Sequence, residues 1–371
     1  MSKNQEIKFI RERAEAPEEV LRAIGFATER KTAQEDVYSF AEGQFFKLRI
    51  NDGMPAKLLR YNRLTSPVIR ESRYESYELQ DKSSRDTARL VFDNIAIAGC
   101  VRKLRRQFEA PNLLLNFDTV FEDGWENELY RVVEVEYSEN AVPSAKSIES
   151  VQQILNCFGV RPFELLPYSN IHMVNMLKMS KAVRSRLGGK PVGKLILIDG
   201  GSGTGKSTIK DLLTKRYKLK YARRETTREP RADDAETNDY RFVSSSNFNR
   251  SALLGEYIEF RDFLFGMSYG LPWSEFVDSL SQGDDVMALI NLGNGHFTKR
   301  LFPAAKLVLL YAGVDTIRKR LLSRGGLTIE QIEERIENNR LATSYIGAYD
   351  LAIDTSQHSP IEVAEKIIAP G

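Results

Sequence analysis

The sequence is poor in the two residue types that build disulfide frameworks and imidazole metal sites. Its 371 residues include 2 cysteines, Cys100 and Cys157, and 3 histidines, His172, His296 and His358. Two cysteines in a chain of this length exclude a disulfide framework and favour a reducing compartment. The histidines lie far apart in the chain, so they give no support to a His/Cys metal site.

Long apolar runs are also absent. No stretch approaches the roughly 18 apolar residues that a membrane span needs, and the first residues, Met-Ser-Lys-Asn-Gln-Glu-Ile-Lys, do not form the apolar core of a signal peptide. We therefore expect a cytoplasmic protein without a membrane partner. A formal net charge of +2 gives no global reason to expect binding to nucleic acid.

The composition is that of a globular protein with more than one domain. Hydrophobic residues make up 42% and charged residues 28% of a chain that is longer than one core usually organises. Residues 1–165 show short alternating strands, residues 166–190 a basic helical linker, and residues 191–371 strands that alternate with helices. The pattern predicts an N-terminal α+β domain with an antiparallel β-barrel and a C-terminal α/β domain with a parallel sheet.

The most informative motif lies in residues 194–208. An apolar run, Leu195–Ile198, precedes G-x-x-x-x-G-K-S, and a helical pattern follows it. Backbone N–H groups of such a loop and the positive end of the helix bind phosphate oxygens, the lysine adds a mobile cation, and the serine ligates Mg²⁺. The predicted ATP-binding residues are Gly200, Gly203, Gly205, Lys206, Ser207 and Thr208.

A second basic motif follows the phosphate-binding loop. It reads Thr-Thr-Arg-Glu-Pro-Arg over residues 226–231, and Asp-Tyr-Arg-Phe-Val over residues 239–243 comes after it. Two arginines three residues apart, Arg228 and Arg231, suit bidentate capture of a monophosphate, and Tyr240 adds a hydroxyl donor.

On these motifs the chain resembles the guanylate kinases from about Lys194 to its C-terminus. The resemblance implies a kinase that uses ATP and Mg²⁺. It makes Arg320 an ATP-binding residue, and Arg324 and Arg335 arginines of a lid that neutralise charge on the transferred phosphoryl group. It places the acceptor phosphate at Arg228, Arg231 and Tyr240, and it adds Asp234, Glu259 and Tyr269 to the acceptor-binding residues. The residues alone leave open whether Glu259 is an acceptor-binding group or a solvated charge.

Three positions depart from the pattern of that family. Arg224 and Leu271 stand where the family carries small hydroxyl residues, and Asn291 stands where it carries an aspartate. Two of these positions normally help to read guanine, and a site loses selectivity when a hydrogen-bonding partner is replaced. We therefore expect an acceptor other than GMP, either another nucleoside monophosphate or a phosphorylated ribose.

The N-terminal half repeats one alternation of charged and apolar residues. In Phe-Phe-Lys-Leu-Arg-Ile over residues 45–50, Lys47 and Arg49 share one face of a strand, while apolar residues occupy the other. One such strand alone is typical of a half-solvated sheet. Repetition over several strands instead predicts a barrel with a charged lumen, to which these further residues belong: Glu6, Lys8, Arg60, Arg73, Lys103, Arg105, Glu134 and Glu136.

This half resembles the triphosphate tunnel metalloenzymes, or CYTH domains, over about residues 4–160. The segments in the family order include residues 4–8, 34–38, 101–105 and 134–136, with Asn4 in place of the first glutamate of the opening signature. The resemblance makes Lys8 and Glu136 catalytic and implies Mg²⁺ or Mn²⁺ at three carboxylates, Glu6, Glu134 and Glu136. The triphosphate would bind Lys8, Lys47, Arg49, Arg60, Arg73, Lys103 and Arg105.

Together the two halves predict a bifunctional nucleotide enzyme. The C-terminal domain would phosphorylate a monophosphate from ATP, and the N-terminal domain would hydrolyse or cyclise a triphosphate with a divalent metal. One alternative is a nucleotide-binding regulatory protein with one inactive domain. A third, lower-ranked alternative is an RNA 5′-triphosphatase that uses the cluster Arg102, Lys103, Arg105 and Arg106.

Overall fold

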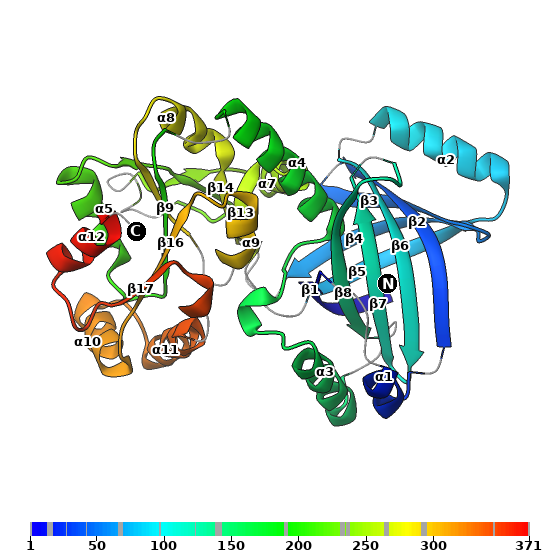
Figure 1. The fold of residues 1–371 in the computed structure, drawn as a ribbon, viewed down its shortest axis with the longest axis horizontal. Coiled ribbons are helices and arrows are strands. Elements are labelled where there is room, and N and C mark those ends of the chain that lie inside the picture. Colours follow the sequence, from blue (N-terminus) through cyan, green and yellow to red (C-terminus); the bar gives the residue numbers. More distant parts are fainter. Residues whose placement is uncertain are drawn as a thin grey trace. The chain divides into compact units, whose positions relative to one another are not determined.

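The computed structural model of the chain divides into two compact units. It describes residues 2–12, 18–26, 28–41, 43–65, 70–95, 98–122, 124–137, 143–188, 192–230, 234, 238–262, 267–290, 295–343 and 346–369. The first unit comprises Met1–Leu177, Ser244–Gly255 and Asp262–Met267. The second unit comprises Lys178–Val243, Glu256–Arg261 and Ser268–Gly371. Figure 1 shows both units as ribbons.

The first unit is built on an eight-stranded antiparallel sheet. The strands are β1 (Ser2–Ile10), β2 (Thr28–Ala41), β3 (Gln44–Asn51), β4 (Ala56–Thr65), β5 (Arg70–Leu79), β6 (Gly99–Ala110), β7 (Leu113–Phe121) and β8 (Glu128–Tyr137). Their order is β1-β5-β4-β3-β2-β6-β7-β8, and β1 pairs with β8 as well as with β5, so the pairing closes into a barrel. The antiparallel sheet expected for this half of the chain is confirmed.

Strand β1 closes the barrel with its two halves. Residues 2–6 pair with β5, and residues 6–10 pair with β8. Glu6 is the residue that both registers share, opposite Arg70 on one side and Glu136 on the other.

Helices cover the apolar outer face of the barrel. They are α1 (Glu18–Ile24), α2 (Lys82–Ile95) and α3 (Ala145–Cys157), and the unit also contains a 3₁₀ turn, η1 (Pro162–Glu164), and helix α7 (Ser245–Leu253). Ile154 of α3 packs with Phe9, Leu115 and Val133 of the sheet. Phe92 of α2 packs with Val37 and Leu48 on another part of the wall. The strands therefore bury apolar side chains outward and keep the alternate positions for the lumen.

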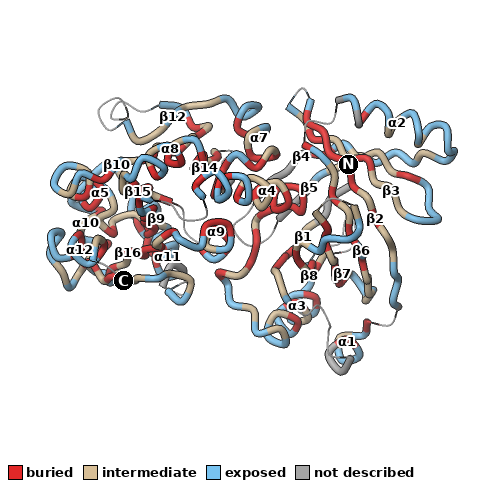
Figure 2. Tube along the Cα trace, turned by 45° about the horizontal axis from the view of Figure 1, so that its top comes forward, coloured by how far each residue is buried: buried red, intermediate tan, exposed pale blue. Residues whose placement is uncertain are grey.

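The second unit contains a five-stranded parallel sheet. Its strands are β10 (Lys220–Tyr221), β15 (Val286–Leu289), β9 (Leu195–Gly200), β16 (Lys306–Tyr311) and β17 (Leu351–Asp354), in that order. All of β9 is buried, as Figure 2 shows. The strand order reverses at β9, and ligands of parallel sheets bind beyond the carboxyl end of such a strand.

Two helices on one side of this sheet complete its core (Figure 1). Ile209 and Leu213 of α5 (Lys206–Lys215) pack with Ile196 and Val308 of the sheet, as do Val363 and Ile367 of α12 (Pro360–Ile368). The other helices of this unit are α8 (Val277–Ser281), α9 (Gly295–Leu301), α10 (Val314–Arg324) and α11 (Ile329–Thr343), with 3₁₀ turns η2 (Trp273–Glu275) and η3 (Ile346–Ala348). The parallel sheet with helices that was expected here is confirmed.

A second, four-stranded sheet carries the basic motif of residues 226–231. Its order is β12 (Tyr240–Phe242), β11 (Arg224–Thr226), β14 (Ser268–Pro272) and β13 (Tyr257–Asp262). Strand β11 runs parallel to β12 and antiparallel to β14. This arrangement brings residues near 224, 240, 259 and 269 onto neighbouring strands.

Helix α4 (Asn170–Arg186) occupies the segment expected to be a basic linker. Its first two turns are buried through Ile171, Met173 and Met176, whereas Lys181 and Arg184 near its end are exposed. Within the described part of the chain, no helix is long and apolar enough to cross a membrane.

Candidate functional site

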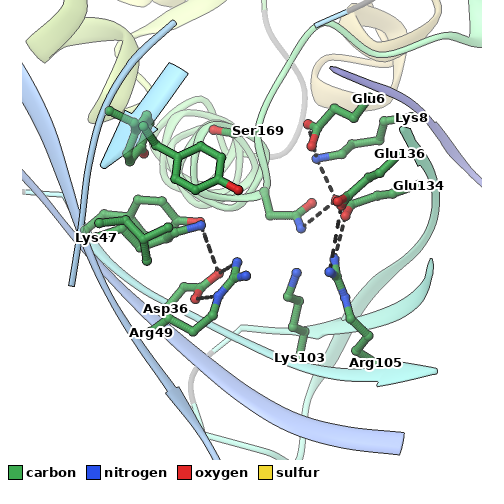
Figure 3. A pocket seen from close by; sticks show the side chains of 15 residues that line it. Glu6, Lys8, Asp36, Lys47, Arg49, Lys103, Arg105, Glu134, Glu136 and Ser169 are labelled. Carbon is green, nitrogen blue, oxygen red and sulfur yellow. Dashed lines mark hydrogen bonds and ion pairs between the residues drawn. The ribbon is translucent and has the colours of Figure 1, made fainter. Parts of the chain in front are cut away.

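The barrel encloses a charged cavity of about 180 Å³. Five cations and four carboxylates line it together with three tyrosines, Leu59, Ser169 and Asn170. The charged lining residues are Glu6, Lys8, Asp36, Lys47, Arg49, Lys103, Arg105, Glu134 and Glu136. Figure 3 shows them in two groups, with Asp36, Lys47 and Arg49 on one wall and the three glutamates and Lys8 on the facing wall.

The three predicted metal-ligating glutamates meet in this cavity. One carboxylate oxygen of each of Glu6, Glu134 and Glu136 lies within 4.8 Å of the others. The β1–β8 register sets Glu6 directly opposite Glu136, and Lys8 opposite Glu134. Like charges at directly opposed positions destabilise a sheet, so the Glu6–Glu136 pair favours a bound cation.

The pKa values of the two glutamates of β8 are shifted in opposite directions. Burial raises the pKa of Glu136 to about 7, and the neighbouring Glu134 and Glu6 charges add to that effect. Burial acts on Glu134 as well, but Lys8, Lys103 and Arg105 together lower its pKa well below its usual value. The surrounding cations therefore hold Glu134 as an anion, whereas burial favours the protonated form of Glu136.

Glu134 is held by partners from three elements. It accepts from Lys8 Nζ at 2.7 Å, from Arg105 Nη2 at 2.5 Å and from Asn170 Nδ2 at 3.1 Å. Lys8 also lies 3.5 Å from Glu6. The Lys8 ammonium is thus shared by two of the three carboxylates.

Asp118 holds the two cations of β6. Its carboxylate, which is fully buried, accepts from Lys103 Nζ at 2.9 Å and from Arg105 Nε and Nη2 at 2.7 Å. Because Arg105 also contacts Glu134, one guanidinium links β7 to β8. The alternation of β6 placed Lys103 and Arg105 in the lumen, and Asp118 is among the residues that follow the family order, but the resemblance gave it no role.

The facing wall holds a second ion pair. Arg49 donates to Asp36 from Nε at 2.8 Å and from Nη2 at 3.0 Å, and Lys47 Nζ lies 3.8 Å from the same carboxylate. Burial opposes ionisation of Asp36, yet Arg49 and Lys47 lower its pKa far below its usual value. Lys47 Nζ also lies 5.8 Å from the ring centroid of Tyr38 and 5.9 Å from that of Tyr61.

Two predicted triphosphate-binding residues need correction. Arg60 and Arg73 are exposed and do not line the cavity, and Arg60 pairs with Glu75 at 2.7 Å. Successive residues of a strand face opposite sides of a sheet, and on β4 and β5 the lumen positions belong to Tyr61 and Tyr74 instead. The side chain of Asn4 lies outside the described residues.

The basic cluster of β6 divides between the two faces of the wall. Lys103 and Arg105 line the cavity, whereas Arg102 pairs with Glu35 and Arg106 with Glu29, each at 2.8 Å. Carboxylates therefore neutralise the outward half of the cluster.

The cavity also contains residues that strand alternation did not indicate. Ser169 and Asn170 line it from the start of α4. The Tyr130 hydroxyl donates to the Asn170 carbonyl oxygen at 3.3 Å and so fixes this helix end. Only a long-range contact brings them there, and no local sequence signal marked it.

In the second unit the phosphate-binding loop joins β9 to α5. Gly203 and Gly205 have φ values of 82° and 91°, the left-handed region that favours glycine. Lys206 Nζ donates to the carbonyl oxygens of Gly200 and Gly201, the latter at 2.8 Å. Burial lowers the pKa of Lys206 to about 8, an effect that Asp199 opposes and Arg224 increases. The cation is therefore held inside the loop, while Ser207 and Thr208 are exposed at the start of α5.

Asp199 is a buried carboxyl at the end of β9 that sequence reasoning missed. It accepts from the Gly200 backbone N–H at 2.7 Å and from the Tyr349 hydroxyl, and burial raises its pKa to about 6. Its position beside the loop was readable from the sequence, but its pairing with a tyrosine 150 residues away was not.

Two of the three arginines predicted for the nucleotide site, Arg320 and the lid arginine Arg335, contact the loop. Arg320 Nη1 donates to the Gly203 carbonyl oxygen at 3.1 Å, and Arg335 Nη1 donates to the Ser202 hydroxyl at 2.9 Å. Arg324 is exposed in the last turn of α10.

The predicted acceptor residues gather on the four-stranded sheet. Arg228 forms a bidentate pair with Asp234, at 2.5 and 2.7 Å, and its guanidinium carbon lies 5.0 Å from the Tyr240 ring centroid. The Tyr240 and Tyr269 rings contact edge to face at 5.7 Å. Arg231, the second arginine of the motif, lies outside the described residues.

Glu259 is not a solvated charge. It is fully buried and pairs with Arg224, whose Nη2 lies 2.8 Å from the carboxylate. Arg224 in turn lies 5.5 Å from the Tyr269 ring centroid. The residue that departs from the guanylate kinase pattern at position 224 thus engages the glutamate that the pattern retains.

Comparison with known proteins agrees with the resemblance of this half. Residues 192–365 match the family model described as guanylate kinase. The guanylate kinase of Fusobacterium nucleatum is 31% identical over 163 residues, which cover 44% of this chain and 88% of that protein. The guanylate kinase of Chlorobium luteolum is 30% identical over 165 residues, or 44% of this chain and 83% of that protein. A solved guanylate kinase from Anaplasma phagocytophilum is 21% identical and covers 48% of this chain and 84% of that one, with a TM-score of 0.38. Through residues 192–365, the chain belongs to the guanylate kinase family.

Proposed function

We propose that the chain is a bifunctional nucleotide enzyme whose second unit transfers the γ-phosphoryl group of ATP to a monophosphate. The observation that carries this proposal is the complete phosphate-binding loop between β9 and α5, with Lys206 held inside it. The relatives named guanylate kinase support the same reaction type.

The charged residues that contact the phosphate-binding loop each have a place in that reaction. Lys206 would bind the β- and γ-phosphate oxygens, and Arg320 and Arg335 approach the loop from α10 and α11. Arg324 would join them as the lid arginine once substrates are bound. The exposed Ser207 hydroxyl and the phosphates offer hard oxygen ligands that fit Mg²⁺, which neutralises phosphate charge. Phosphoryl transfer is accelerated mainly by positioning and electrostatics, which these residues supply.

The acceptor phosphate would bind at Arg228 and Tyr240, and the sequence motif adds Arg231 to this site. The rest of the acceptor molecule would contact the Arg224–Glu259 pair and Tyr269. To recognise guanine, Glu259 would need a carboxylate that is free to accept hydrogen bonds from the base, but Arg224 already pairs with it. The Leu271 side chain cannot form a hydrogen bond with the base in its place. The acceptor is therefore a different nucleoside monophosphate or a phosphorylated ribose.

Phosphorus NMR tests this activity directly. The protein is incubated with ATP, Mg²⁺ and each of GMP, AMP, CMP, UMP and ribose phosphates, and Lys206→Ala is the matched control. We expect ADP and a newly phosphorylated acceptor from the wild type and none from the variant. Turnover of no acceptor, or equal turnover by Lys206→Ala, contradicts the proposal.

We further propose that the first unit hydrolyses or cyclises a triphosphate with the help of Mg²⁺ or Mn²⁺. The observation that carries this proposal is one cavity in which three carboxylates within 4.8 Å face five cations. Lys8, Lys47, Arg49, Lys103 and Arg105 would bind the phosphate oxygens, and Lys8 and Arg105 also contact the glutamates.

The carboxylate group suits a hard divalent cation. Glu6, Glu134 and Glu136 offer only oxygen ligands, as Mg²⁺ and Mn²⁺ prefer, and the Glu6–Glu136 repulsion is relieved when a cation binds. A bound cation would supply charge stabilisation to the phosphate oxygens. The five cations of the lumen would then hold the phosphate groups of the substrate in line.

Product analysis separates the two reactions of the first unit. Inorganic tripolyphosphate, ATP and GTP are each incubated with Mn²⁺ or Mg²⁺, in the Lys206→Ala background that removes the kinase. Free phosphate or pyrophosphate indicates hydrolysis, and a cyclic nucleotide with pyrophosphate indicates cyclisation. Glu136→Gln and excess EDTA should each abolish product, and product that survives both contradicts the proposal.

A further inference from the structure

Helix α11 contacts the phosphate-binding loop through one buried amide. Asn339 is 5% exposed, and its Nδ2 donates to the Ser202 carbonyl oxygen at 3.0 Å and to the Arg335 carbonyl oxygen at 2.8 Å. Arg335, one turn earlier on the same helix, donates to the Ser202 hydroxyl at 2.9 Å. Two side chains of α11 therefore hold both the backbone and the side chain of one loop residue.

Gly201 leaves the space that this amide fills. A Cβ atom on Gly201 would lie 2.1 Å from Asn339 Oδ1 and 2.6 Å from Nδ2, which is closer than real Cβ atoms approach. The amide cannot turn away cheaply, because both hydrogen bonds of Nδ2 would break. The φ angle of Gly201 is not in the positive range, unlike those of Gly203 and Gly205. Position 201 therefore requires glycine because a side chain would not fit there, and not because its backbone conformation is unusual.

We propose that Asn339 is a positioning residue of the nucleotide site and that Gly201 and Asn339 form a complementary pair. Asn339 fixes the Gly201–Ser202 segment in the shape that receives phosphate oxygens. It also ties that segment to the helix that carries Arg335. A preorganised loop loses less freedom when it binds its ligand, so the pair acts on ATP affinity. This inference depends on ATP binding by the second unit and not on the identity of the acceptor.

The pair makes a distinctive prediction about a double variant. Gly201→Ala brings a methyl group against Asn339, and Asn339→Ala removes the obstacle, so the second change should repair the first. We expect Gly201→Ala to weaken Mg·ATP binding by at least about tenfold and Asn339→Ala by about three- to tenfold, as coupled neighbours do. The double variant should bind within about threefold of Asn339→Ala alone.

Gly205→Ala is the matched control. Position 205 has a φ of 91° and open space where a Cβ atom would lie, so an alanine there is strained whatever stands at position 339. Its loss of ATP affinity should persist in the Asn339→Ala background.

Isothermal titration of the full chain with Mg·ATP, and thermal unfolding of the free proteins, test the pair. Should Gly201→Ala alone fail to fold, recovery of a folded, ATP-binding double variant supports the same pairing. A double variant as weak as Gly201→Ala overturns it. So does an Asn339→Ala variant that melts earlier but binds ATP as the wild type does, because its role is then only structural. A wild type that binds no ATP overturns both this inference and the proposed kinase, whereas ATP binding without turnover contradicts only the kinase.

Discussion

Lys206 predicts a pH dependence of ATP binding. Burial lowers its pKa to about 8 in the free protein, and only the charged ammonium attracts phosphate oxygens. Bound ATP stabilises the charged form and raises this pKa, so binding takes up a proton near pH 8. Affinity should be constant below about pH 7 and fall by up to about tenfold per pH unit above pH 8.

Calorimetry in HEPES and Tris, whose ionisation enthalpies differ, measures that proton uptake. Lys206→Arg is the control, because a guanidinium keeps its charge at pH 9 and its affinity should vary little between pH 7 and 9. An unchanged wild-type affinity across pH 7 to 9 would show that the lysine stays charged without ATP.

Asp118 is predicted to matter most for the stability of the barrel. It is fully buried and is the shared partner of Lys103 and Arg105. Asp118→Asn leaves both cations with one charged partner fewer, and breaking a buried pair costs about 3–5 kcal/mol. We expect a loss of that order in the free energy of unfolding, measured with urea.

Glu75→Gln is the comparison for Asp118→Asn. Glu75 pairs with Arg60 on the exposed side of the sheet, where such pairs contribute only about 0–1 kcal/mol. Equal losses for the two variants would mean that the Asp118 network is no more valuable than a surface pair.

The alternation of charged and apolar residues along a strand predicted which residues share a face. It failed where the sequence did not show which face of the strand points into the lumen. Lys47 with Arg49 and Lys103 with Arg105 line the cavity as expected. Arg60 fits the same charged and apolar alternation, but its strand presents Leu59 and Tyr61 inward. Which face is inside depends on the register with neighbouring strands, and one strand does not contain that information.

At the scale of elements, the cap of α12 is expected to set its stability. The Ser359 hydroxyl accepts from the Glu362 N–H at 3.3 Å, and the Glu362 carboxylate accepts from the Ser359 N–H at 2.8 Å. Such a capping box satisfies two free donors of the first turn. Ser359→Ala should lower the free energy of unfolding by about 1 kcal/mol.

Ser323→Ala is the matched serine variant for this cap. Ser323 lies in the last turn of α10, where its hydroxyl donates only to the carbonyl oxygen of Arg320. Urea unfolding should show little change, because alanine is the better helix former. A loss as large as that of Ser359→Ala would remove the cap as the explanation.

Helices that show a clear helical periodicity of apolar residues and end at turn residues were predictable from the sequence. The sequence pattern predicts helices over residues 144–157 and 170–187, and the structure has α3 at Ala145–Cys157 and α4 at Asn170–Arg186. The contacts that these helices make were not predictable. Asn170 reaches Glu134, 36 residues away, and Asn339 reaches Ser202, 137 residues away, because the fold brings their elements together.

At the scale of the whole molecule, two compact units, each with hydrophobic clusters of its own, predict two thermal transitions. One core packs around Phe9 and Ile154, and the other around Ile198 and Val308. A ligand stabilises the state that binds it, by about 2.7 kcal/mol at a hundred times its dissociation constant. In calorimetric melting, tripolyphosphate with Mn²⁺ should raise the transition of the first unit, and Mg·ATP should raise that of the second unit in the wild type but not in Lys206→Ala. A single transition that both ligands shift alike would contradict this.

The kinase assignment was predictable because its signature is local. The phosphate-binding loop and the motif of residues 226–231 each lie within a few consecutive residues. Both can therefore be recognised from the sequence without knowledge of long-range contacts. The departure at position 224 was visible, but its meaning was not, because Glu259 is 35 residues further along. Only the packing of β11 and β13 into one sheet shows that the new arginine neutralises the retained glutamate.

The divided pairing of β1 makes the barrel unequally tolerant of insertions. An extra residue before Glu6 would shift only the half that runs beside β5. One inserted between Glu6 and Lys8 would turn the Lys8 ammonium out of the lumen and set an apolar side chain against Glu134. Length variation among homologous chains should therefore be permitted before Glu6 and forbidden between Glu6 and Lys8.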